Sequence, residues 1–147
     1  MILLRTPEAT EAIGRALAGR LERGDVVALF GALGAGKTTL ARGILRGLGH
    51  RGDVASPTFP IVQTYEPPET RLPVWHVDLY RIEQAAELEE LGLDEGRQAG
   101  VMLIEWPERL PVLWPDALRL RLEIAEHGGR ALTAELPPAW GARWPPQ

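Results

Sequence analysis

Several residue types are rare or missing in this chain of 147 residues. It contains no cysteine and no asparagine, and Lys37 is the single lysine among 16 basic residues. Without cysteine, the chain has neither a disulfide framework nor a cysteine metal site. No apolar run approaches the roughly 20 residues of a membrane span, and the start MILLRTPEATEA lacks the basic beginning and long apolar middle of a signal peptide. These absences predict a cytoplasmic protein with no membrane partner.

The net charge of the chain argues against one further class of function. The formal net charge is −4 and the pI is about 5.4, which argues against a protein that coats nucleic acid, because phosphate backbones attract basic surfaces. Contact with RNA through a partner protein stays open. Hydrophobic residues make up 45% of the chain and charged residues 24%, as in globular proteins. We expect a single domain over residues 1–136, followed by a proline- and tryptophan-rich tail at 137–147.

Apolar patterns alternate between helix and strand along the chain. A helix is expected from Thr6 as N-cap to Gly24, with others from Lys37 to Gly49 and over 83–99. Strands are expected at 26–30, at the end of 50–66, at 73–80, at 101–105, and as a hairpin at 118–124 and 130–136. This order predicts an α/β fold of three layers, like that of P-loop NTPases, with a mainly parallel central sheet and an antiparallel C-terminal hairpin.

A glycine-rich loop lies between the strand at 26–30 and the helix that follows. Residues 31–38, GALGAGKT, satisfy the phosphate-loop pattern G-x-x-x-x-G-K-S/T in its strand–loop–helix context. The glycines let backbone N–H groups surround a phosphate, aided by the positive end of the helix. Lys37 adds a charge at the terminal phosphates, and the Thr38 hydroxyl completes the shell of a bound Mg²⁺. The Asn/Thr-Lys-x-Asp element of guanine-selective proteins is absent, so ATP is the expected nucleotide.

Two predicted strands end in acids. Asp78 ends VWHVD (74–78), and Glu105 ends VMLIE (101–105). An acid at the carboxyl end of a buried strand lies beside the phosphate loop in an open α/β sheet. A P-loop enzyme needs a carboxylate to hold the metal and, for hydrolysis, one to orient water. Asp78 and Glu105 are therefore the candidates for these two tasks, and the sequence does not decide which residue has which.

Three further residues allow two interpretations each. Thr58, in SPTF (56–59), lies where many P-loop proteins carry a nucleotide-sensing loop, although S-P-T is also an ordinary turn. His76 alternates with Val77 on a strand and fits a packed or surface histidine better than a catalyst. Trp106 follows Glu105 and is either a core residue or a wall of the site.

Four stretches together resemble one family, the small bacterial ATPases of tRNA threonylcarbamoyladenosine biosynthesis known as TsaE or YjeE. They are LGAGKTTLARG (33–43), SPTF (56–59), HVDLYR (76–81) and IEWPE (104–108). Their order and spacing also agree with the family, and the resemblance covers residues 6–136. HxDLYR followed by I-E-W-P is far more specific than the phosphate loop alone.

The resemblance implies roles for individual residues. Glu105 would be the acid nearest the metal, Trp106 would lie beside the nucleotide, and Asp78 and Thr58 would belong to two switch-like elements. The family's N-terminal helix and late hairpin contribute to the base pocket. The residues that would bind phosphate are Gly34, Ala35, Gly36, Lys37, Thr38 and Thr39, and the candidates for the base pocket are Glu8, Thr10 and Arg130.

The resemblance also implies partners. Such proteins work with TsaD and TsaB, which form the threonylcarbamoyl-transfer core, and meet tRNA indirectly through that complex. The core modifies the adenosine 3′ of the anticodon in tRNAs that read codons beginning with A. The implied activity is ATP hydrolysis, weak in the isolated chain, that resets the core and does not perform the transfer.

Two rival functions fit a P-loop of this size. A small-molecule kinase would close an arginine-bearing lid over the phosphates, but the candidate lid at 81–100 is acidic and carries Arg81 and Arg97 as its arginines. A scaffold that binds nucleotide without hydrolysing it would show no turnover even with its partners.

Overall fold

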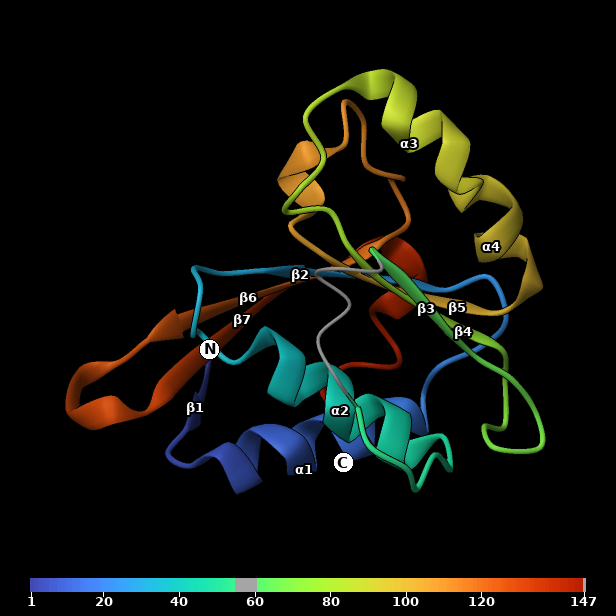
Figure 1. Cartoon of the computed structure of the whole chain (residues 1–147). Helices are drawn as coiled ribbons and strands as arrows, with labels where there is room; N and C mark the ends of the chain where they lie inside the picture. The colour runs from blue at the N-terminus through green and yellow to red at the C-terminus, as the bar shows by residue number, and fades with distance from the viewer. Residues whose placement is uncertain (55–60, 147) are drawn as a thin grey trace.

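A computed structural model describes residues 1–54 and 61–146 of the chain (Figure 1). In this part of the chain a seven-stranded sheet has the order β1-β7-β6-β2-β5-β4-β3. The strands are β1 Ile2–Leu4, β2 Val26–Phe30, β3 Val62–Tyr65, β4 Val74–Asp78, β5 Val101–Glu105, β6 Leu118–Ile124 and β7 Arg130–Glu135. The α-helices are α1 Pro7–Ala18, α2 Lys37–Gly47, α3 Ala85–Leu91 and α4 Leu93–Ala99.

The centre of the sheet is parallel and its edges are antiparallel. Strand β2 pairs in parallel with both β5 and β6, and β5 pairs in parallel with β4. Strand β3 closes one edge antiparallel to β4, while β7 and β1 follow β6 antiparallel at the other edge. The predicted parallel sheet with an antiparallel C-terminal hairpin is confirmed. The three-residue strand β1 was not predicted, because a run this short has no pattern of its own and forms by pairing with β7.

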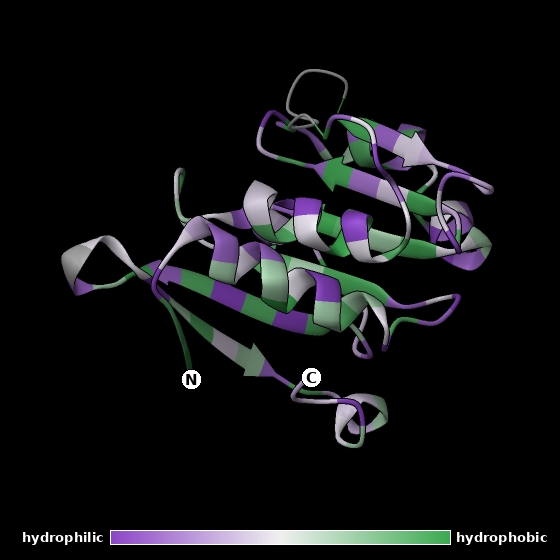
Figure 2. Cartoon of the chain, turned by 90° about the horizontal axis from the view of Figure 1, so that it is seen from below, coloured by the Kyte–Doolittle hydropathy of each residue, from purple (hydrophilic) through white to green (hydrophobic). Residues whose placement is uncertain are grey.

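Helices cover both faces of the sheet, which confirms the predicted three layers. In Figure 1, α1 and α2 lie below the strands and α3 and α4 above them. Side chains alternate along β2. Val27 therefore packs in the core between the sheet and helices α1 and α2, while Val26 packs in the core on the other face of the sheet. The view from below in Figure 2 shows α1 and α2 lying across the apolar central strands.

Helix α1 packs very closely on α2, and glycines make this approach possible. A Cβ atom at Gly43 would lie 2.2 Å from the backbone oxygen of Glu11, and one at Gly14 would lie 2.6 Å from the oxygen of Leu40. A side chain at either position would therefore push the helices apart. This contact fixes α2, and with it the glycine loop, against the start of α1.

The predicted boundaries of two helical regions need correction. Thr6 caps α1 as expected, its Oγ1 accepting from the Ala9 N–H at 3.1 Å, but the helix ends at Ala18 with Gly19 as C-cap instead of at Gly24. Gly24, at a φ of 91°, forms a turn before β2, and its N–H donates to the Gly100 carbonyl. The helical region 83–99 is divided by Gly92, whose φ of 67° ends α3 and begins α4.

The tail packs on the body of the protein. Trp140 is fully buried in the core that α1 and α2 form with the sheet. The Arg143 guanidinium lies 3.8 Å from the Trp140 ring centroid and forms an ion pair with Asp25 at 2.7 Å. None of the helices in the described residues has the length and apolar character needed to cross a membrane.

Candidate functional site

The glycine loop joins the carboxyl end of β2 to the first turn of α2. Gly31, Gly34 and Gly36 have φ angles of 150°, 79° and 106°, values that residues with a side chain rarely adopt. Gly36 is the N-cap of α2 and provides no side chain at that end, so the first N–H groups of the helix are available to an external anion. Ala35 is buried and faces the core, which anchors the loop from below.

Lys37 is buried at the start of α2, with 5% of its surface exposed. Its Nζ donates to the Gly31 carbonyl at 2.6 Å and lies 3.8 Å from the centroid of the Trp106 ring. Burial lowers the pKa of Lys37 below its ordinary value of 10.5, an effect that Glu105, Asp78 and Glu108 oppose as nearby negative charges. A buried cation without a direct ion pair to any of these acids within the described residues suits an anionic ligand.

The two acids meet at the carboxyl ends of neighbouring parallel strands. Asp78 and Glu105 are register partners across β4 and β5, and each is 3% exposed. Thr38 Oγ1 lies 3.3 Å from Glu105 Oε1 and 3.4 Å from Oε2. Asp78 Oδ1 accepts from the Tyr80 N–H at 2.9 Å. Glu105 is thus adjacent to the P-loop threonine, and Asp78 is held by the backbone that follows its own strand.

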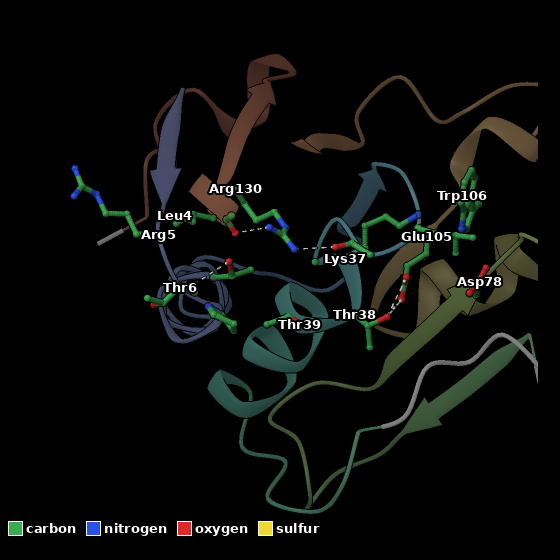
Figure 3. Close-up of a pocket in the computed structure, with 16 residues that line it drawn as sticks. Leu4, Arg5, Thr6, Lys37, Thr38, Thr39, Asp78, Glu105, Trp106 and Arg130 are labelled. Carbon is green, nitrogen blue, oxygen red and sulfur yellow. Dashed lines mark hydrogen bonds between the residues drawn. The ribbon is translucent and has the colours of Figure 1, made fainter. Parts of the chain in front are cut away.

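A cavity of about 280 Å³ separates two groups of residues (Figure 3). We define its inner wall as Lys37, Thr38, Asp78, Glu105 and Trp106. Its outer wall comes from β1, the start of α1 and the β6–β7 hairpin. The outer-wall residues are Leu4, Arg5, Thr6, Pro7, Thr10, Gly128 and Arg130.

Arg130 ties the outer wall to the glycine loop. Its Nε donates to the Ala35 carbonyl and its Nη2 to the Gly34 carbonyl, each at 3.0 Å. Its Nη1 donates to the carbonyls of Gly128 at 2.7 Å and Gly129 at 3.1 Å. One guanidinium therefore links the turn of the hairpin to the loop, a role that the sequence did not predict.

Most of the predicted site residues line this one cavity, and two of those that the structure describes do not. Glu8 is exposed on the first turn of α1 and is not part of the lining, and Ala35 lies beneath the loop. Thr58 falls outside the described residues. The predicted residues that do line the cavity are Gly34, Gly36, Lys37, Thr38, Thr39, Asp78, Glu105, Trp106, Thr10 and Arg130.

Sequence reasoning missed part of the outer wall and one buried neighbour. Thr6 was recognised as a helix cap, and its T-P-E signal could have placed a helix start near the site, but nothing in the pattern of Leu4 or Arg5 indicates a cavity. His76, expected to be a packing or surface residue, is fully buried with its Nε2 2.6 Å from Glu105 Oε2.

The oxygen ligands of the inner wall fit Mg²⁺. No group of three or more histidine, cysteine, aspartate or glutamate side chains in the described residues forms a metal cage. Mg²⁺ is usually bound by one or two carboxylates together with substrate phosphates, and it seldom occupies a cage made of protein alone. The Thr38 hydroxyl beside the Glu105 carboxylate, next to an anion-binding loop, is an arrangement of this kind.

A parallel sheet whose β2 leads through a glycine loop into α2 defines a P-loop type of α/β protein. The model of the family described as "Threonylcarbamoyl adenosine biosynthesis protein TsaE" matches residues 4–132. The chain therefore belongs to the TsaE family, as its four sequence stretches predicted.

Individual relatives agree with this family. The chain is 46% identical to the tRNA threonylcarbamoyladenosine biosynthesis protein TsaE of Streptomyces coelicolor, over 77% of this chain and 78% of that protein. It is 43% identical to the protein of the same name from Bacillus subtilis, over 83% and 75% of the two chains. The crystal structure of Bacillus subtilis YdiB superposes with a TM-score of 0.78 at 33% identity, over 96% of this chain and 88% of that one.

Proposed function

We propose that this protein binds and hydrolyses ATP with Mg²⁺ and thereby drives threonylcarbamoyl modification of tRNA in the cytoplasm. The modified base would be the adenosine 3′ of the anticodon in tRNAs that read codons beginning with A. The protein would act with the transfer-core proteins TsaD and TsaB, meet tRNA through their complex, and leave the transfer step to them. The observation that carries this proposal is the buried Lys37 at the glycine loop, with Thr38 and Glu105 in contact beside it. The relatives' names supply the pathway.

The residues of the inner wall would have two roles, binding the phosphates and binding the metal ion. Lys37 and the N–H groups of the loop would neutralise the phosphates, and Thr38 with Glu105 would hold Mg²⁺. When bound, the metal would stabilise the negative charge that develops on the phosphate oxygens. Trp106, which covers Lys37, would exclude water from that side of the site.

Asp78 is then the acid for the attacking water. In the reaction, the water oxygen bonds to the γ-phosphorus, the bond from that phosphorus to the β–γ bridging oxygen breaks, and ADP leaves with the bridging oxygen. Asp78 accepts a proton from the water and passes it to solvent. Glu105 is the acid in contact with the P-loop threonine, so it is assigned to the metal and not to this step.

Slow turnover of the isolated chain follows from the cations around the cavity. Two arginines line the cavity. Arg130 directs its donors to the four carbonyls described above, and the side chain of Arg5 points away from the inner wall (Figure 3). An arginine that stabilises the transition state typically accelerates P-loop hydrolysis by about 10³–10⁵. We therefore expect that the partners are needed for full activity.

The geometry does not favour the kinase alternative. Most of the candidate lid at 81–100 lies in α3 and α4, which pack on the face of the sheet opposite α1 and α2, where Leu93 is buried. Arg97 forms an ion pair with Asp116, and Asp94 accepts from the indole N–H of Trp114. These contacts hold the segment away from the phosphate loop.

Reconstitution tests the proposal. The protein would be combined with TsaD, TsaB, tRNA, ATP and the threonylcarbamoyl donor, and modified nucleosides per core complex would be counted by mass spectrometry. We expect several turnovers with the wild type, but not with Lys37→Ala or Glu105→Gln. Glu135→Gln, which alters an exposed glutamate on β7, serves as the matched control. If adding the wild type does not raise the number of modified nucleosides per core complex, the proposed function is refuted. If the number rises without formation of ADP, the scaffold that binds nucleotide without hydrolysing it is favoured.

A further inference from the structure

His76 and Glu105 form a buried pair between two neighbouring strands. His76 Nε2 lies 2.6 Å from Glu105 Oε2, and the side chains are 0% and 3% exposed. His76 stands two residues before Asp78 on β4, so both side chains are on the same face of the strand. That face is directed toward α2, because Val74, two residues earlier, packs in the core beneath α1 and α2.

The direction of this hydrogen bond follows from its partners. An ionised carboxylate only accepts hydrogen bonds, so His76 donates through Nε2–H. The other ring nitrogen, Nδ1, is buried and has no hydrogen-bond partner among the described residues. A histidine that served packing alone has no need of a polar ring here, and Val74 and Val77 fill the neighbouring places with apolar side chains.

The pair also fixes the orientation of the carboxylate. Glu105 has three side-chain torsions, and Thr38 approaches both of its oxygens at 3.3–3.4 Å. The much shorter contact from His76 engages Oε2 and leaves Oε1 as the less committed oxygen at the cavity. Residues that hydrogen-bond a metal-binding carboxylate from behind orient it and sharpen metal binding.

From this geometry we infer that His76 is a positioning residue for Glu105, holding the carboxylate in the orientation that binds Mg²⁺ with the nucleotide. The inference rests on the proposed function, since it assigns Glu105 to the metal. His76 touches neither the nucleotide nor the metal in this arrangement. It acts through Glu105.

Two substitutions separate positioning from packing. His76→Gln keeps an N–H donor at about the position of Nε2, whereas His76→Leu keeps the bulk and removes the donor. His50→Leu is the matched control. His50 is also largely buried and lies 3.7 Å from a glutamate, Glu69, but it follows the far end of α2, about 16 Å along the helix axis from the glycine loop.

The first measurement is Mg²⁺-dependent nucleotide binding. The fluorescent analogue N-methylanthraniloyl-ADP would be titrated in EDTA and then at increasing Mg²⁺. We expect His76→Leu to weaken the apparent Mg²⁺ affinity by about 10-fold or more, as loss of such a partner typically does, with little change in EDTA. His76→Gln should restore most of the affinity, and His50→Leu should match the wild type.

The second measurement needs no nucleotide. The proton NMR spectrum of the free protein should contain a downfield imidazole N–H resonance that His76→Leu removes, His50→Leu leaves in place and Glu105→Gln shifts. If His76→Leu is folded by circular dichroism and retains wild-type Mg²⁺ dependence, the inference is wrong. The inference is also wrong if His76→Leu loses the same nucleotide affinity with and without Mg²⁺ and His76→Gln does not restore it. That result would show a packing role for His76. If the wild type binds no nucleotide, the proposed function itself has failed.

Discussion

The two walls of the cavity differ in burial, in charge and in the part of the fold that builds them. The inner wall comes from the central parallel strands and the start of α2, and its ionisable side chains Lys37, Asp78 and Glu105 are at most 5% exposed. The outer wall comes from a three-residue edge strand, a helix start and a hairpin turn, where Arg5, Thr6 and Gly128 are exposed. Buried charges interact strongly and are held rigidly, whereas exposed edges are easily altered. Under the proposed function, we therefore expect the chemistry at the inner wall and recognition at the outer one.

The largest expected effect is on the inner wall. Lys37→Met removes the single cation that the glycine loop presents to phosphate while keeping much of the side-chain length. Hydrogen bonds to charged groups contribute about 1.5–3 kcal/mol, so ATP affinity in a calorimetric titration should fall by about 10- to 100-fold. Unchanged affinity would contradict the assignment of phosphates to this wall.

A smaller effect is expected where the two walls meet. Arg130→Ala removes the four hydrogen bonds that connect the hairpin with the glycine loop. We expect a loss of about 1–2 kcal/mol in the free energy of unfolding, measured by urea denaturation, together with weaker nucleotide binding. Arg130→Lys should recover only part of the loss, because lysine lacks the planar fork that reaches several carbonyls at once. Full recovery by lysine would show that charge alone matters.

The third prediction is a gain in the stability of the nucleotide-free protein. Burial disfavours the charge on Lys37, as its lowered pKa indicates, so the nucleotide-free protein should gain stability when that charge is removed. We expect Lys37→Met to raise Tm by roughly 2–4 °C, the shift that about 1 kcal/mol produces in a domain of this size. Calorimetry of the free protein provides the measurement. A lower Tm would mean that the contacts with Gly31 and Trp106 outweigh the cost of burial.

The smallest expected effects on nucleotide binding are those of substitutions at two positions near the start of α1. Thr10 is 2% exposed and lines the cavity, whereas Glu8 is exposed and does not. Thr10→Val should weaken nucleotide binding modestly, while Glu8→Ala should leave binding unchanged and cost only about 0.3–1 kcal/mol through its favourable position in the first turn of the helix. Fluorescence titrations of both variants test this difference. A clear loss of affinity in Glu8→Ala would place Glu8 in the base pocket after all.

The sequence predicted the inner wall far better than the outer one, and the difference has a physical cause. The glycine loop is a local motif whose conformation depends on its own residues. Asp78 and Glu105 could be placed together because parallel strands bring their carboxyl ends to one edge of the sheet. Strand β1, residues Ile2–Leu4, forms only by pairing with β7, and no pattern within three residues reveals such a partner.

The sequence by itself determined the family, the order of the helical regions and of the strands after β1, the phosphate loop, and the two acids at the ends of their strands, because each of these depends on local patterns. Only the tertiary structure decided which distant groups touch. Arg130 reaches the carbonyls of Gly34 and Ala35 across 95 or more positions, and His76 reaches Glu105 across 29. Contacts of this kind depend on strand register and helix packing, which are properties of the whole folded chain.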